Sequence, residues 1–201
     1  MARKRDPERE AQRRAVILLA AARAFVRDGL RGTSIAAICK EAGISPGLLY
    51  YYFPSKEALI EAMAEADLAA IRGFAERLVT LDDLLDAAVS SSEFMSFTFN
   101  ESSNLLGGAL AFDLHAEATR NPRVHAIMER HYHQISALFG ERLAAAQKSG
   151  GVSLAHDPVK LARLVGAVRE GLLMMSAMGP DVVDADMRAT ARRMLETAAR
   201  S

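Results

Sequence analysis

Residues 43–59 hold the side chains with the clearest chemical meaning in the chain. Ser45 and Pro46 are typical of the first positions of a helix, where free backbone N–H groups and the positive end of the helix dipole attract phosphates. Three consecutive tyrosines at positions 50–52 add hydroxyls and flat rings, and they span about 200° of a helix, so they cannot all face a core. Lys56 adds a positive charge. These residues predict contact with a polyanion.

Short helices are predicted to position this stretch. Apolar residues recur three and four positions apart through most of the chain, and the strict alternation typical of strands is absent. One helix is expected within residues 7–29, a second within 33–43 and a third from residue 45 to about 53. Glycine ends the first two, since it accepts backbone conformations that other residues resist. Leu49 and Phe53 are expected core residues, and the second and third helices together make a helix-turn-helix.

The rest of the chain is also predicted to be helical. Ser55 can cap a long helix that runs to about residue 78. Five more helices are expected, at residues 81–99, 105–119, 122–148, 158–178 and 184–199, separated by polar residues or by Pro and Gly. We therefore expect an all-α protein of about nine helices.

Composition bounds the class of protein. The chain has 201 residues, of which 50% are hydrophobic and 25% charged, and this favours a packed globule over a disordered chain. No apolar run approaches the roughly 20 residues that a membrane-spanning helix needs. The single cysteine, Cys39, cannot form an internal disulfide, and the N-terminus lacks the apolar core of a signal peptide. We expect a soluble, cytoplasmic protein.

The net charge of the chain is +0, but the charges are unevenly distributed along it. Residues 1–60 carry 11 Lys and Arg against 6 Asp and Glu, whereas residues 61–201 carry 14 against 19. Opposite charge in the two parts suggests that the first meets a polyanion and the second has another task. Solvated helix faces are the alternative explanation.

The pattern at residues 17–59 resembles that of the TetR (tetracycline repressor) family of bacterial transcriptional regulators. The shared positions are Ala20, Ala21, Phe25, Gly29, Thr33, Ser34, Ile35, Ile38, Ala42, Gly43, Leu49, Tyr50, Lys56, Glu57, Ala58 and Leu59. The resemblance implies a helix-turn-helix DNA-binding domain at residues 1–57 and a helical effector-binding and dimerisation domain at residues 58–201. It implies a homodimeric repressor that a small hydrophobic or amphipathic ligand releases from a palindromic operator.

The resemblance also implies which residues contact double-stranded operator DNA. They are Arg5, Thr33, Ser34, Ser45, Pro46, Gly47, Leu48, Tyr50, Tyr51, Tyr52 and Lys56. Pro46, Gly47 and Leu48 have no polar side chain for base edges, so contact with thymine methyl groups and DNA shape must supply more of the specificity. The basic arm at residues 3–5 either enters the minor groove or only screens phosphates.

Aromatic and methionine residues on the central helices are candidates for the effector site, because in this fold those helices surround the effector cavity. Methionine-rich walls adapt to varied apolar shapes. The candidates are Phe94, Phe97, Phe99, Phe112, Met128, His131, Tyr132, Met174, Met175 and Met178. Core packing is the alternative for each of them, and His131 is either a core histidine or a polar anchor for the ligand.

The helix predicted at residues 158–178 is apolar almost all round, so a partner subunit is its expected cover. With the last helix it provides the candidate dimer interface, which comprises Leu161, Leu164, Val165, Val168, Leu172, Met187, Met194 and Leu195. Arg169 and Glu170 form either a buried pair in that interface or a contact to the ligand.

Two other classes of function remain as alternatives. An enzyme lacks support, because the chain has no Glu-x-x-His pair, no glycine-rich phosphate loop and no His-Glu-x-x-His motif; we expect no catalytic residue and no cofactor. His125, Glu129 and His133 have a spacing that can line up metal ligands, but they lie opposite the apolar face, so we expect no metal. A sequence-tolerant architectural DNA-binding protein without an effector is the second alternative, and a cavity between the central helices would distinguish it from a sensor.

Overall fold

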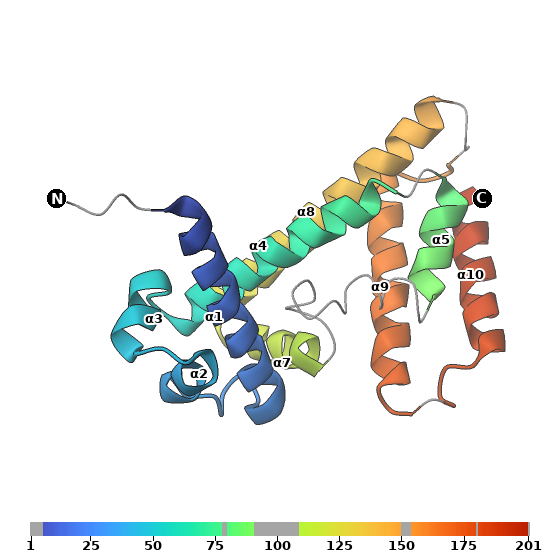
Figure 1. Cartoon of the computed structure of the whole chain (residues 1–201). Coiled ribbons are helices and arrows are strands. Elements are labelled where there is room, and N and C mark those ends of the chain that lie inside the picture. The colour runs from blue at the N-terminus through green and yellow to red at the C-terminus, as the bar shows by residue number, and fades with distance from the viewer. Residues whose placement is uncertain (1–5, 78–79, 91–108, 150–153, 180, 201) are drawn as a thin grey trace. The chain divides into compact units, whose positions relative to one another are not determined.

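The computed structural model describes residues 6–77, 80–90, 109–149, 154–179 and 181–200, and these residues form nine helices (Figure 1). The helices are α1 Pro7–Asp28, α2 Ile35–Ala42, α3 Pro46–Tyr52, α4 Lys56–Ala75, α5 Leu81–Val89, α7 Ala109–Ala118, α8 Pro122–Lys148, α9 Pro158–Ser176 and α10 Ala185–Arg200. No strand occurs within these ranges. The predicted all-α fold is therefore confirmed. None of the described helices is long and apolar enough to cross a membrane.

Local capping bonds explain where most of the helices begin. A side chain just ahead of the helix accepts a backbone N–H bond from the first turn at 2.8 to 3.4 Å. The capping residues are Asp6, Ser34, Ser45, Ser55, Thr80, Asn121, Asp157 and Asp184. The predicted starts at Ser45 and Ser55 are confirmed, and Ser34 rather than Thr33 caps α2.

The chain forms two compact units that are not contiguous in sequence. The first unit comprises residues 1–67 and 101–129, and the second comprises residues 68–100 and 130–201. Consequently α7 and the first turns of α8 belong with α1, α2 and α3. The sequence-based division at residue 57 follows the order of the helices and does not anticipate this grouping.

The core of the first unit takes side chains from each of its helices. Within it α1 packs against α2 and α7, and α2 packs against α3. The buried side chains include Ile17, Ala21, Phe25, Leu30, Ile38, Leu49, Phe53, Leu59, Met63, Leu110, Leu114, Val124 and Ile127. The expected core positions Leu49 and Phe53 are thus confirmed.

The second unit is built around α5, which packs against α9 and α10. Its main apolar cluster joins Leu81, Leu84, Leu85 and Ala88 of α5 to Leu143, Leu154, Leu161, Ala162, Val165, Leu195 and Ala199. A smaller cluster joins Val89, Leu172 and Val183, with Val168 and Met187 packed against it. The face of α9 that meets α5 is therefore covered within one protomer.

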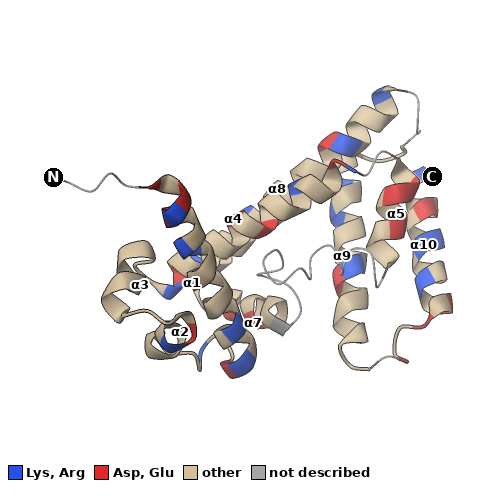
Figure 2. Ribbon diagram, in the orientation of Figure 1, with Lys and Arg blue, Asp and Glu red and all other residues tan. Residues whose placement is uncertain are grey.

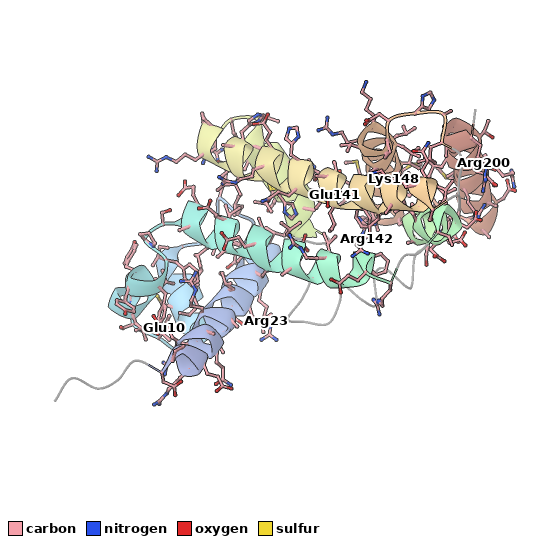
Figure 3. The ribbon with its side chains drawn as sticks, turned by 90° about the horizontal axis from the view of Figure 1, so that it is seen from above. Glu10, Arg23, Glu141, Arg142, Lys148 and Arg200 are labelled. Atoms are coloured by element: carbon pink, nitrogen blue, oxygen red, sulfur yellow. The ribbon has the colours of Figure 1, made fainter. Side chains whose placement is uncertain are left out.

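Arginines of α10 tie that helix to α5. Arg192 forms ion pairs with Asp82 and Asp86, and Arg200, labelled in Figure 3, lies 3.9 Å from Asp82. Figure 2 shows acidic positions on α5 and basic positions on α10. Arg188 donates from Nη1 to the carbonyl oxygen of the last α5 residue at 2.9 Å. A cation at this position interacts favourably with the negative end of the α5 dipole.

Candidate nucleic-acid interface

The outer surface of α3 is exposed and uncharged. Tyr50 and Tyr51 are 50% and 57% exposed, whereas the neighbouring Leu49 is buried. The other candidate contacts on this element are either exposed, as for Ser45, Pro46 and Gly47, or half-buried, as for Leu48 and Tyr52. Figure 2 shows that α3 carries no Lys, Arg, Asp or Glu. This surface offers hydroxyls, rings and apolar atoms to DNA, and positive charge must come from other elements.

The end of α3 is fastened to α1 by an arginine that the sequence analysis missed. Arg14 of α1 donates from Nη1 to the carbonyl oxygen of Tyr52 at 3.2 Å. Its guanidinium also lies 4.5 Å from the ring centroid of Phe53, a cation–π contact. No local pattern marks this role, because Tyr52 lies 38 positions along the chain. Arg14 therefore sets the position of α3 relative to α1.

Of the two residues expected to contact DNA at the start of α2, Thr33 and Ser34, Thr33 is buried and does not reach DNA. Thr33 is 1% exposed, and its hydroxyl lies 3.0 Å and 2.8 Å from the carbonyl oxygens of Ala24 and Gly29. These bonds join the end of α1 to the start of α2, so the residue is structural. Ser34, its exposed neighbour, remains the candidate at this position.

Lys56 is half-buried at the start of α4, and its ammonium donates to the carbonyl oxygen of Leu30 at 3.1 Å. An ammonium carries three N–H groups, so this bond leaves donors for a phosphate. The remaining candidate, Arg5, lies outside the described residues.

Residues 43–47 also match the Gly-x-Ser-x-Gly spacing of a nucleophile elbow, a signal that the sequence analysis overlooked. An elbow needs a strand before the serine and a helix after it. Here Ser45 follows α2, and its hydroxyl accepts from Leu48 N at 3.3 Å as the cap of α3. The residue therefore has the role of a helix cap.

The candidate effector residues occupy three kinds of environment. Met128 and His131 are buried, and Phe112 and Tyr132 are half-buried. Phe94, Phe97 and Phe99 lie outside the described residues. Met174, Met175 and Met178 are 52%, 39% and 73% exposed, which does not fit the wall of an enclosed cavity. We correct their assignment from the effector site to the surface of the second unit.

The polar residues of α8 and α9 do not assemble a metal site. His125, Glu129 and His133 are exposed, and no group of three or more His, Cys, Asp or Glu within the described ranges is placed to hold a metal ion. His133 Nδ1 instead lies 2.8 Å from Arg163 Nη2. Arg169 and Glu170 are both half-buried on α9.

Several large apolar side chains are exposed on α9, on α10 and in the turn that follows α9. Leu164 is 44% exposed and Met194 is 66% exposed, and both were predicted interface residues. Leu164, Met174 and Met175 fall within about 100° of helix, so they share one side of α9, and Met178 lies in the turn that follows this helix. We call these four residues and Met194 the α9–α10 face. Large exposed apolar patches mark interaction surfaces.

The other predicted interface residues are buried or half-buried in the protomer. Leu161, Val165, Leu172 and Leu195 are buried within the protomer, and Val168 and Met187 pack against its apolar clusters. The prediction was wrong for the four buried residues, because the packing of α5, α9 and α10 within one protomer covers them. Val168 and Met187 are half-buried and stay predicted interface residues.

Two titratable groups in the first unit have shifted pKa values. The pKa of Glu57 is lowered, first by a bond from its own backbone N–H at the start of α4 and then by the Ser55 hydroxyl, with smaller contributions from Asn121 and Arg123. Burial raises the pKa of the Cys39 thiol. A buried thiol of raised pKa is a poor nucleophile, so Cys39 packs as a core residue.

Two family profiles match the chain. Residues 17–63 match "Bacterial regulatory proteins, tetR family", and residues 108–200 match "BetI-type transcriptional repressor, C-terminal". The first match covers α2, α3 and parts of α1 and α4, and the second covers α7, α8, α9 and α10.

Individual relatives agree with the profiles. The chain is 33% identical to the HTH-type transcriptional regulator UidR of Escherichia coli K12 over 161 residues, and these residues cover 78% of each of the two chains. It is 27% identical over 188 residues to TtgR of Pseudomonas putida, covering 94% of this chain and 78% of TtgR. Among solved structures, Salmonella enterica GusR has a TM-score of 0.76 at 32% identity, over 94% of this chain and 96% of GusR.

Proposed function

The chain belongs to the TetR family of bacterial regulatory proteins and is a helix-turn-helix transcriptional regulator, and from this premise we propose that it is a homodimeric repressor. In this proposal, a small hydrophobic or amphipathic molecule binds the region at residues 58–201 and releases the protein from a palindromic operator. The observation that carries the proposal is the exposed, uncharged surface of α3, whose end Arg14 fastens to α1.

DNA recognition follows from the chemistry of that surface. In this proposal the exposed tyrosines Tyr50 and Tyr51 bond phosphate oxygens or base edges through their hydroxyls, and the apolar atoms of Pro46 and Leu48 contact thymine methyl groups. Lys56 and Ser34 would bond phosphates of the DNA backbone on either side of α3. Because α3 has no arginine or asparagine for bidentate base contacts, the operator should be distinguished partly by its shape and deformability.

The α9–α10 face supports assembly as a homodimer. An isologous dimer needs one self-complementary patch on each copy, and this face offers five exposed apolar side chains, four on the last two helices and one, Met178, in the turn after α9. A dimer would place two copies of α3 at the two half-sites of a palindrome. Assembly through this face replaces the buried interface that the sequence predicted.

Support for an apolar effector comes from the types of residue among the remaining candidates. The candidates that remain are Phe112, Met128, His131 and Tyr132, together with the phenylalanines at positions 94, 97 and 99, and most of them are apolar. The C-terminal profile is described as that of a transcriptional repressor, which supports repression. Ligand binding would shift the population of the DNA-binding conformation and so weaken operator affinity.

Selection of bound duplexes from random DNA tests the proposal directly. We expect an enriched palindrome whose half-sites lie about one or two helical turns apart. If no sequence is enriched, and salt weakens binding equally for every duplex, the helix-turn-helix is a non-specific electrostatic grip and the proposal fails.

The role of Lys56 can be tested on the selected operator. Lys56→Gln removes the charge and keeps a donor for the carbonyl oxygen of Leu30. It should weaken binding to all duplexes alike and reduce the salt slope by about one unit. Lys40→Gln, at an exposed position on α2, is the matched control. A loss confined to the operator would contradict the phosphate assignment.

A further inference from the structure

The turn between α1 and α2 is held by side chains from distant parts of the chain. Leu30 is 6% exposed, and its backbone lies outside both helices, so its N–H and C=O need partners. The N–H donates to Asp113 Oδ2 of α7 at 3.0 Å, and the C=O accepts from Lys56 Nζ of α4 at 3.1 Å. Two side chains that are 83 and 26 positions away therefore satisfy one residue of the turn.

The geometry of this turn is tightly specified. Gly29 has a φ of +73°, and a Cβ added to it would lie 3.4 Å from Asp113 Oδ2. A Cβ added to Gly32 would lie 2.3 Å from the carbonyl oxygen of Asp28, so no other residue fits there without a backbone shift. Because the turn joins α1 to α2, and α2 packs against α3, its position sets that of the helix-turn-helix.

A second carboxylate of α7 faces the same turn. Glu117 lies one helical turn after Asp113, and its Oε2 is 3.5 Å from Arg31 Nε and 2.9 Å from Arg120 Nε. Its pKa is lowered by the bond from Arg120 and by the charge of Arg31. An exposed ion pair of this kind contributes little stability, so the buried N–H of Leu30 makes Asp113 the principal link.

The same helix carries a candidate effector contact. Phe112 is half-buried on α7, and successive helical residues point about 100° apart. One short helix thus presents a ring and a carboxylate in different directions. Since a hydrogen bond weakens steeply once its geometry is lost, a shift of α7 by about an ångström or more would release Leu30.

We propose that Asp113 is the positioning residue through which α7 holds the α1–α2 turn, and with it α2 and α3, in the arrangement that reads DNA. This inference rests on the proposed function for its DNA readout. It makes α7, which the sequence analysis assigned to the effector domain, a working part of the DNA-reading unit.

The test compares full-length Asp113→Ala and Asp113→Asn with the wild type. The alanine variant leaves the buried N–H of Leu30 without its acceptor, so we expect operator affinity to fall by about tenfold and amide exchange at Leu30 to accelerate by a similar factor. The asparagine variant keeps an acceptor oxygen and should stay within about threefold of the wild type in both measurements. Binding to a non-operator duplex should change little in either variant.

Glu65→Ala is the matched control, since Glu65 is exposed and lies in the same unit. Its carboxylate makes no hydrogen bond or ion pair with the described part of the chain. Wild-type affinity and exchange in Asp113→Ala would overturn the inference, as would an equal loss in the alanine and asparagine variants. Failure of the wild type to select an operator would refute the proposed function instead, and the exchange at Leu30 would still decide whether Asp113 holds the turn.

Discussion

Replacing Met194 with glutamate should separate the two protomers of the proposed dimer. Met194 is 66% exposed on α10 and belongs to the α9–α10 face. Full burial of a methionine side chain stabilises by about 1.5–3 kcal/mol, so burying the exposed part should contribute about 1–2 kcal/mol per copy. An isologous interface contains the residue twice, and the substitution therefore removes about 2–4 kcal/mol.

This loss predicts a rise in the dimer dissociation constant of about thirtyfold or more, because about 1.4 kcal/mol corresponds to a factor of ten. Glutamate adds the cost of taking a charge out of water, so the estimate is a lower bound. Sedimentation velocity over a concentration series measures the constant, and circular dichroism checks that the variant keeps its helices. Operator binding should weaken in parallel, since two linked half-site contacts become independent.

Val16→Glu provides the matched control. Val16 is 49% exposed on α1 in the first unit, so it receives the same substitution outside the α9–α10 face and should leave the dissociation constant unchanged. If Met194→Glu folds normally and dimerises as tightly as the wild type, the assignment of the interface to this face is refuted. Equal weakening by both substitutions would show that the effect does not depend on the face.

Four further substitutions test the packing and electrostatics of the two units. Gly140→Ala should destabilise the protein by about 1–3 kcal/mol, because the new Cβ would lie 2.6 Å from a side-chain atom and 2.9 Å from the Cα of Val159. Gly73→Ala is the control, since its Cβ meets open space, and it should raise the midpoint of thermal unfolding. Equal thermal midpoints in these two variants would contradict the packing argument. Arg14→Ala should weaken operator binding by about tenfold, because one hydrogen bond that positions α3 and a cation–π contact are lost. Gel-shift titration measures the operator affinity, and an unchanged affinity would show that α3 needs no such anchor. For Glu57, the folded-state pKa is lowered, so its stabilisation is present above the ordinary carboxylate pKa and is lost as pH falls through the folded value. Urea unfolding from about pH 5 to pH 3 should therefore show a steeper loss of stability in the wild type than in Glu57→Gln, and parallel curves would exclude this contribution.

The sequence alone determined the helix-turn-helix and most of the helices, but the helix predicted at residues 81–99 was wrong in its end, because α5 stops at Val89 and Ser90 is extended. Capping residues such as Ser45, Ser55 and Asp157 bond backbone groups two or three positions away, so both partners of each bond are visible in a short window of sequence. The start of α8 after Asn121 was predicted for the same reason. The exposure of the tyrosines on α3 also followed from local geometry, because consecutive positions cannot share one face of a helix.

Only the tertiary structure decided which side of an apolar helix is covered and which polar groups meet. Periodicity marks α9 as apolar almost all round, but the packing of α5 buries Leu161 and Val165 and leaves Leu164 exposed. Neither the anchoring of α3 by Arg14 nor the bond from Leu30 to Asp113 has a local signal, since the partners lie 38 and 83 positions apart. Such contacts depend on how the helices pack, and many arrangements of the same helices satisfy the local rules equally well.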